Sequence, residues 1–261
     1  MATESLEDRV KRLEHDMGCV RILVEEGRVF EHIHEKELVG LRDVVRTRRL
    51  EVVDEKGKIR AGLSVGKDGP TLGVFDEKGK FRVVLGLTED GPALGLFDEK
   101  GKGRAALGMY EDGPALSMLD DKGNVRATLT VLKKGPTLVL NDEKGDPRVT
   151  LVALKDGPEL RLHDEGKGRT VLGMTELGPG LDLFDQKGEL RARLGVTEDG
   201  PTLELLDEKG RGRVELAVDK DGPRLVLSDE KSKVRAGLAV DEVGTRLELG
   251  DEKGKVIWNA P

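Results

Sequence analysis

Apolar and polar positions alternate in short runs along residues 50–261, and these runs recur at a fixed spacing. One unit contains Val83, Leu85 and Leu87, followed after a turn by Leu94 and Leu96. A period of two residues indicates β-strands with one apolar face. The Asp that opens one of the turns recurs every 22 residues, with one interval of 21, at positions 54, 76, 98, 120, 142, 164, 185, 207, 229 and 251. We therefore expect about ten 22-residue units of two strands each.

Two turn signals separate the strands. An Asp-Gly step before Pro, as at Asp68-Gly69, favours a two-residue hairpin loop because both residues can adopt positive φ. The motif D-E-K-G, as in Asp76 to Gly79, favours a four-residue loop built on a type I turn, with Gly in the left-handed region. The shortened turn Asp164-Glu165-Gly166 predicts a three-residue type I loop with a bulge.

These loops predict the register of an antiparallel meander. The expected pairs are Val65 with Leu72, Leu63 with Val74, Val74 with Phe81, Leu72 with Val83, Leu162 with Gly168 and Leu160 with Thr170. Each pairing places Leu and Val on one common face, because side chains alternate between the two faces of a strand. The deletion in the shortened turn leaves that face intact.

The other face is predicted to be polar and solvated. It carries one Arg in each of nine units, at positions 60, 82, 104, 126, 148, 169, 191, 213 and 235. Because each Arg lies near a D-E turn, we expect surface ion pairs, each contributing about 0 to 1 kcal/mol. Other outward positions of this face vary freely, namely Gly62, Val84, Ala106, Thr128, Thr150, Val171, Arg193, Glu215 and Gly237. That variation favours a structural shaft over a repeated binding site.

An array with one apolar face needs a cover in water, because the exposed Leu and Val would exceed the apolar patch of a typical monomer. A propeller needs blades that are apolar on both faces, which the Arg column disfavours. A single-chain β-solenoid would hide the leucines inside, but would use both turn motifs as corners. We expect instead a homo-oligomeric triangular β-prism, in which copies of the meander pack their apolar faces inward.

The segment 1–48 is predicted to be a separate N-terminal oligomerisation domain, followed by the β-repeat domain 49–261. From Ser5 the apolar residues follow a heptad pattern typical of a coiled coil, at Leu6, Val10, Leu13, Met17, Val20 and Val24, and again at Leu38, Leu41 and Val45. The pattern is interrupted at Gly27, Glu31 and His34, where Phe30 and Ile33 could take over the core through a stutter. Residues 5–47 are therefore expected to form one broken helix or two helices.

A coiled coil before repetitive β segments with Gly and Pro in their turns resembles the trimeric fibre shafts of phage and viral type. The resemblance covers the overall plan of residues 5–261 and no diagnostic motif. It implies a rigid spacer or display element without catalysis, and it favours a trimer. Val and Leu at the heptad core positions by themselves favour two strands, so a dimer remains the alternative.

The composition indicates the kind of source, partner and compartment to expect for the protein. The charged fraction is 36%, aromatic residues make up 3%, and Asn and Gln are rare, a profile typical of heat-adapted proteins. The net charge of −7 is spread evenly without a basic stripe, so no nucleic-acid partner is expected. No apolar run is long enough to span a membrane, and the N-terminal sequence lacks a signal peptide. The default expectation is a cytoplasmic protein, with export by a signal-less route left open.

No motif predicts a catalytic, cofactor or metal site. The acidic turns alternate with Lys and lack calcium-loop patterns, and no phosphate-binding glycine motif occurs. His34 is expected to be a solvated or partly packed residue in preference to an axial ring of symmetric copies, and Cys19 a buried inert thiol. Phe75, Phe97 and Phe184 share one repeat position, where packing of hairpin ends is favoured over a ligand shelf. Trp258 is expected to plug the open end of the core.

The sequence therefore predicts a structural, self-associating β-repeat scaffold that is not an enzyme. The alternative is a binding module whose repeated polar face recognises a polymer or a partner protein.

Overall fold

The computed structural model describes residues 22–24, 29–31, 47–175 and 178–260. The chain divides into two compact units, 1–124 and 125–261. The first contains β1 (Ile22–Val24), β2 (Val29–Glu31), β3 (Arg49–Val53), β4 (Ile59–Gly66), β5 (Gly69–Phe75), β6 (Phe81–Leu87), β7 (Pro92–Phe97), β8 (Gly103–Tyr110) and β9 (Gly113–Leu119). The second contains β10 (Val125–Leu132), β11 (Gly135–Asn141), β12 (Pro147–Leu154), β13 (Gly157–Asp164), β14 (Lys167–Thr175), β15 (Gly178–Phe184), β16 (Leu190–Thr197), β17 (Gly200–Leu206), β18 (Gly212–Asp219), β19 (Gly222–Ser228), β20 (Val234–Asp241), β21 (Gly244–Gly250) and β22 (Val256–Ala260).

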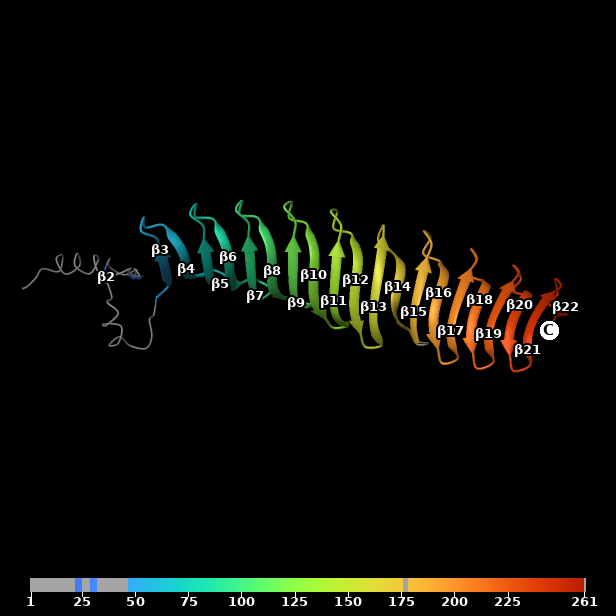
Figure 1. Ribbon diagram of the computed structural model, residues 1–261. Helices are drawn as coiled ribbons and strands as arrows, with labels where there is room; N and C mark the ends of the chain where they lie inside the picture. Colours follow the sequence, from blue (N-terminus) through green and yellow to red (C-terminus); the bar gives the residue numbers. More distant parts are fainter. Residues whose placement is uncertain (1–21, 25–28, 32–46, 176–177, 261) are drawn as a thin grey trace, which may run out of the picture. The chain divides into compact units, whose positions relative to one another are not determined.

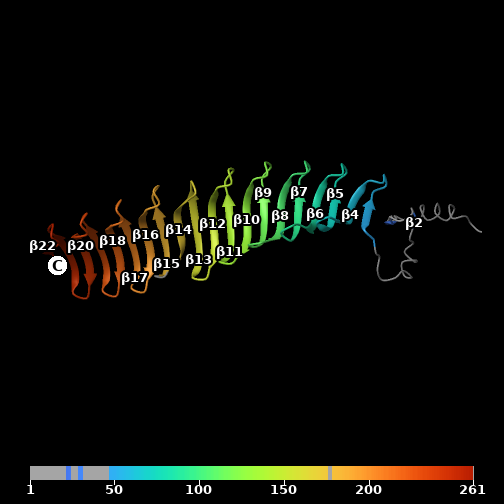
Figure 2. The same cartoon turned by 180° about the vertical axis from the view of Figure 1, so that it is seen from behind.

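Strands β3 to β9 of the first unit and β10 to β22 of the second each form an antiparallel meander, in which a strand pairs with its neighbours in the chain (Figures 1 and 2). Strands β1 and β2 form a separate two-stranded sheet. In each unit the D-E-K-G turns line one edge of the sheet and the Asp-Gly turns line the opposite edge (Figure 1). The pairings join only chain neighbours among the described residues, so each sheet is open. The predicted all-β repeat meander is thus confirmed, and no helix occurs in the described part of the chain.

The N-terminal helix prediction is wrong at its described residues, which are those of β1 and β2 together with Thr47. Strands β1 and β2 pair with each other in the segment for which a helix was expected. Both are rich in Ile, Val and Phe, which favour strands over helices, and the predicted heptad pattern is interrupted between them. The rest of the predicted coiled coil, including Cys19 and His34, lies outside the described residues. The domain boundary at residues 48 and 49 stays a prediction.

The D-E-K-G turn has the predicted conformation. In the turn that opens at Asp76, the carbonyl oxygen of Asp76 accepts a hydrogen bond from the N–H of Gly79 at 3.0 Å, as in a type I turn. Gly79 has a φ of 77°. An added Cβ at Gly79 would meet no atom within 4 Å, so Gly is favoured here for its backbone conformation alone.

The Asp-Gly turn differs from the prediction by two residues. Leu63 pairs with Leu72 and Val65 with Pro70, in place of the expected Val65–Leu72 and Leu63–Val74 pairs. The loop residues are Lys67 and Asp68, and positive φ falls on Gly69, which belongs to the following strand. Since the Asp does not adopt positive φ, the loop is not the mirror-image turn that the Asp-Gly signal predicts.

The register across the D-E-K-G turn is also shifted by two. Val74 pairs with Val83 and Leu72 with Leu85, in place of the expected Val74–Phe81 and Leu72–Val83 pairs. Phe75 pairs with Phe81, and a β-bulge follows. The prediction was wrong because a bulge places two residues of one strand opposite one residue of the other, which a straight ladder does not allow for.

The shortened turn is a two-residue loop and not the predicted three-residue loop. Glu165 and Gly166 have φ of 49° and 74°, which are the two positive values of a mirror-image type I turn. The bulge is retained beside this loop, and Leu162 consequently pairs with Thr170 and Leu160 with Leu172. The expected Leu162–Gly168 and Leu160–Thr170 pairs are therefore wrong. Each of the three errors is an even shift, which keeps the Leu and Val side chains on their predicted face. Phe81 is the exception, because the bulge turns it to the opposite face, where it pairs with Phe75.

Candidate functional site

One face of each sheet, which we call the leucine face, carries a continuous row of cross-strand leucine pairs. In the first unit the row runs Leu50, Leu63, Leu72, Leu85, Leu94, Leu107 and Leu116. In the second it runs Leu129, Leu138, Leu151, Leu160, Leu172, Leu181, Leu194, Leu203, Leu216, Leu225, Leu238 and Leu247. The row exists because the true register places Leu opposite Leu in every hairpin.

Two further apolar rows flank the central one. On the side of the Asp-Gly turns, a Pro pairs with Val, Leu, Met or Ala, as Pro201 does with Val196. On the side of the D-E-K-G turns, a small or β-branched residue of one strand pairs with a larger apolar residue of the next, as Ala192 does with Leu205. The leucine face is therefore three rows wide and apolar except at Thr170 and Thr245.

No described residue of either unit covers the leucine face. Leu194 is 50% exposed and Leu216 is 48% exposed, and comparable values recur along the central row. In the described part of the chain, Ala217 is the only buried hydrophobic residue, and it lies on the other face, where it pairs with Thr202 and Arg224. The sheets thus build no hydrophobic core of their own.

The opposite face, which we call the polar face, carries the predicted Arg column. Five of these arginines pair with the Asp that opens the preceding D-E turn or the shortened turn, among them Arg148 with Asp142 at 2.8 Å and Arg191 with Asp185 at 2.5 Å. Arg193 and Asp182 add a cross-strand pair at 2.7 Å. The predicted surface ion pairs are confirmed for these arginines, and their charges are largely neutralised.

The aromatic residues of the first unit pack over glycines of the polar face. The rings of Phe75 and Phe81 lie 4.5 Å apart between centroids. A Cβ added at Gly73 would come within 3.1 Å of Phe75 and 2.8 Å of Phe81, so both rings occupy the space that a side chain would fill. The ring of Phe97 covers Gly95 in the same way, at 3.0 Å. Local packing therefore accounts for Phe75 and Phe97, as predicted.

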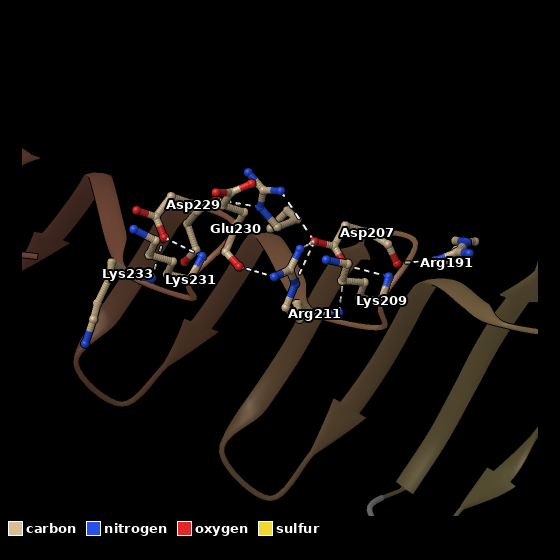
Figure 3. Close-up of polar contacts among 10 residues, drawn as sticks. Arg191, Asp207, Lys209, Arg211, Asp229, Glu230, Lys231 and Lys233 are labelled. Carbon is tan, nitrogen blue, oxygen red and sulfur yellow. Dashed lines mark hydrogen bonds and ion pairs between the residues drawn. The ribbon is translucent and has the colours of Figure 1, made fainter. Parts of the chain in front are cut away.

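The D-E-K-G edge carries a regular set of hydrogen bonds that link one unit of the repeat to the next. In each turn one carboxylate oxygen of the Asp accepts two backbone N–H groups, which in the turn at Asp76 are those of Lys78 and Lys80, both at 2.9 Å. The ammonium of Lys80 then reaches the carbonyl oxygen of Glu99 in the next turn, at 3.3 Å. Arg211 makes the equivalent contact with Glu230 (Figure 3).

These hydrogen bonds lower the pKa of the turn carboxylates. The pKa of Asp185 falls to about 2, because its carboxylate accepts hydrogen bonds from the backbone N–H of Glu189 and from the guanidinium of Arg191. The pKa of Asp207 is held well below its usual range chiefly by the side chain of Arg211. The turn aspartates are thus used structurally as ionised hydrogen-bond acceptors.

The structure places the remaining residues of interest in ordinary surroundings. His163 lies 3.2 Å from the hydroxyl of Thr150. Trp258 pairs with Leu249 on the leucine face and is 47% exposed, so its role as a plug stays a prediction. No group of three or more His, Cys, Asp or Glu side chains within the described ranges is arranged to hold a metal ion. A search of the same residues finds no helix long and apolar enough to cross a membrane.

Comparisons with known proteins add little to this description. No protein-family model matches the chain, and no curated protein matches it. The solved structures with a detectable likeness include the Tc holotoxin pore of Photorhabdus luminescens with a mutated TccC3, at 12% identity and a TM-score of 0.21. They also include TcdB2-TccC3, at 13% identity and a TM-score of 0.21. Each match covers 80% of this chain and 15% of the other. At these TM-scores the likeness supports no inference about fold or function.

Proposed function

We propose that this protein is a structural scaffold, a self-associating β-repeat shaft whose copies cover one another's leucine faces. The observation that carries the proposal is the uncovered leucine face. In the second unit the large side chains of this face are 39–53% exposed at positions that recur from β10 to β21, and an apolar surface of this length exceeds the largest patch of a typical monomer, which is about 300–600 Å². A protein with this surface is stable in water only with a partner.

Another copy of the chain is the partner that fits best. The face repeats one pattern of rows along each sheet, and a second copy repeats the same pattern at the same spacing. A stable interface of standard size needs roughly 800 Å² per partner, and the leucine face of the second unit extends across every strand from β10 to β21. A trimer that encloses the leucines in a triangular prism is preferred over a dimer, because three narrow sheets would bury all three faces in one aliphatic interior.

The proposal assigns no catalytic activity, cofactor or nucleic-acid partner to the chain. The polar face supports this assignment, because five of its column arginines are paired with neighbouring carboxylates and its outward positions differ from one repeat to the next. A binding module would present one preserved polar arrangement in several units. Heat resistance and a cytoplasmic location are further parts of the proposal, supported by the composition, which is rich in charged residues and contains a single Cys.

Two pairs of neighbouring residues provide a test with matched controls. Leu129 and Leu172 lie on the leucine face, whereas Thr128 and Val171 precede them on the same strands and lie on the polar face. We expect Leu129→Asp with Leu172→Asp to reduce the mass measured by light scattering from that of an oligomer towards the 28.5 kDa monomer. Thr128→Asp with Val171→Asp should leave the oligomer intact. Equal effects of the two double substitutions would contradict the proposal.

A further inference from the structure

The leucine face is not flat but carries a regular relief. In the row beside the D-E-K-G edge, a large side chain on each strand that follows an Asp-Gly turn protrudes, as Leu183, Leu205 and Leu227 do at 40–41% exposure. The residues opposite them are smaller and less exposed, and at several positions they are alanines. Protruding and recessed positions therefore alternate from strand to strand, with protruding side chains two strands, or about 10 Å, apart.

Each recessed alanine lies at the bottom of a hollow with three apolar walls. Ala192 is directly opposite Leu183 on one neighbouring strand and Leu205 on the other. Leu194 follows two residues later on the same strand and therefore on the same face, and it is 50% exposed. Because a methyl group is surrounded here by three larger side chains, the surface is depressed by about the size of an aliphatic side chain.

The same hollow recurs in both units. Ala236 is opposite Leu227 and Leu249, with Leu238 on its own strand. In the first unit the hollows at Ala61 and Ala105 are built in the same way, Ala61 by Val52, Val74 and Leu63, and Ala105 by Leu96, Met118 and Leu107. Other 22-residue repeats have Val or Thr at the position equivalent to Ala192, and the larger side chain makes the hollow shallower.

Nothing in the described ranges of the chain explains why these positions are small. An alanine with nothing above it could be replaced by a larger residue without a clash, and Ala is a weaker strand former than Leu, Val or Thr. A small residue is required only if another side chain enters the hollow. The chemistry of the hollow, which is aliphatic on all sides and without a polar atom except the backbone, fits a Leu, Val or Met side chain.

We propose that the alanine hollows of the leucine face receive the protruding Leu, Val or Met side chains of a second copy of this chain, so that the copies interlock. This inference rests on the proposed self-association, and it explains why the leucine face would select another copy of this chain over other apolar partners. Because the hollows and the protruding residues belong to the same repeated pattern, a copy carries a matching side chain for every hollow. A partner without the 22-residue period would fill one hollow and miss the next.

A residue exchange separates interlocking from general apolar contact. The double variant Ala192→Leu with Leu205→Ala exchanges the two members of one cross-strand pair and leaves the composition and apolar area of the face unchanged. We expect it to raise the dissociation constant of the oligomer at least tenfold, measured by analytical ultracentrifugation, because it blocks one hollow and removes one protruding side chain. Ala192→Ser keeps the hollow open and should leave the dissociation constant within about twofold.

Folding of each variant is checked by circular dichroism, and Ala236→Leu repeats the test at an independent hollow. An exchange variant that assembles as tightly as the wild-type protein would overturn interlocking while leaving self-association in place. A wild-type chain that stays monomeric would overturn both proposals. A tenfold loss in the exchange variant and at Ala236→Leu, with Ala192→Ser unaffected, would support the interlocking face.

Discussion

Replacement by Ala is expected to lower the free energy of unfolding by very different amounts at two glycines of the hairpin formed by β17 and β18. Gly200 begins β17 with a φ of 129°, and a Cβ added there would lie 2.0 Å from the carbonyl oxygen of Val218 on β18. Gly210 lies in the D-E-K-G turn that follows β17, with a φ of 72°, and a Cβ added there would meet no atom within 4 Å. The two positions therefore distinguish two reasons for requiring Gly. Gly210 is required for its backbone conformation alone, whereas at Gly200 a Cβ would also clash with a neighbouring strand.

Gly210→Ala should cost about 1 kcal/mol of the free energy of unfolding, since a left-handed L-residue costs roughly 1–2 kcal/mol and Ala loses less chain entropy than Gly. Gly200→Ala should cost about 3 kcal/mol or more, because the overlap of more than 1 Å forces the backbones of β17 and β18 apart. Urea unfolding at one fixed protein concentration measures both, because association also affects the midpoint. Equal losses for the two variants would refute the close approach of the β17 and β18 backbones at Gly200.

The remaining predictions concern the turns and the aromatic pair. Ser232 occupies the Gly position of its turn with a φ of 58°, so Ser232→Gly should stabilise the protein by about 0.5–1 kcal/mol, seen as a higher urea midpoint. The pKa of Asp185 lies at about 2 in the folded chain against 3.8 for a free Asp, so its ionised form stabilises the fold above about pH 4 and this contribution is lost as the pH falls towards 2. Melting temperatures measured across that window should fall less steeply for Asp185→Asn than for the wild-type protein. Phe81→Ala removes the ring packed on Phe75 and Gly73 and should cost about 1–2 kcal/mol, because the ring is only partly buried.

The alternation of apolar residues was sufficient to predict the faces of the sheets but not the register. Leu63 and Leu72 were placed on the correct face and paired with the wrong partners, because the Asp-Gly motif does not show that Gly69 begins the next strand. Likewise, the bulge that follows Phe81 depends on hydrogen bonds of the folded turn, and a residue count does not reveal it. Both errors preserved parity for the leucines and valines, so the antiparallel meander was predicted correctly, whereas Phe81 was placed on the wrong face.

The leucine face, too, could be predicted only in part from the sequence. Its existence follows from the sequence alone, since period-two strands and the two turn motifs place Leu and Val on one side. Its relief does not, because the hollow at Ala192 appears only once Leu183 and Leu205 are known to lie directly opposite. Aligning the 22-residue repeats with one another would have given one sign of the hollows. Ala recurs at the equivalent positions 61, 105, 127, 192 and 236.

Light scattering of the full chain after size exclusion, over a range of protein concentrations, tests the central claim most directly. Copies that cover one another's leucine faces predict a mass that is a whole multiple of 28.5 kDa, with three copies preferred, and the same mass down to low micromolar concentration. A well-folded protein that remains a monomer throughout this range, with its leucine face in contact with water, would contradict the account.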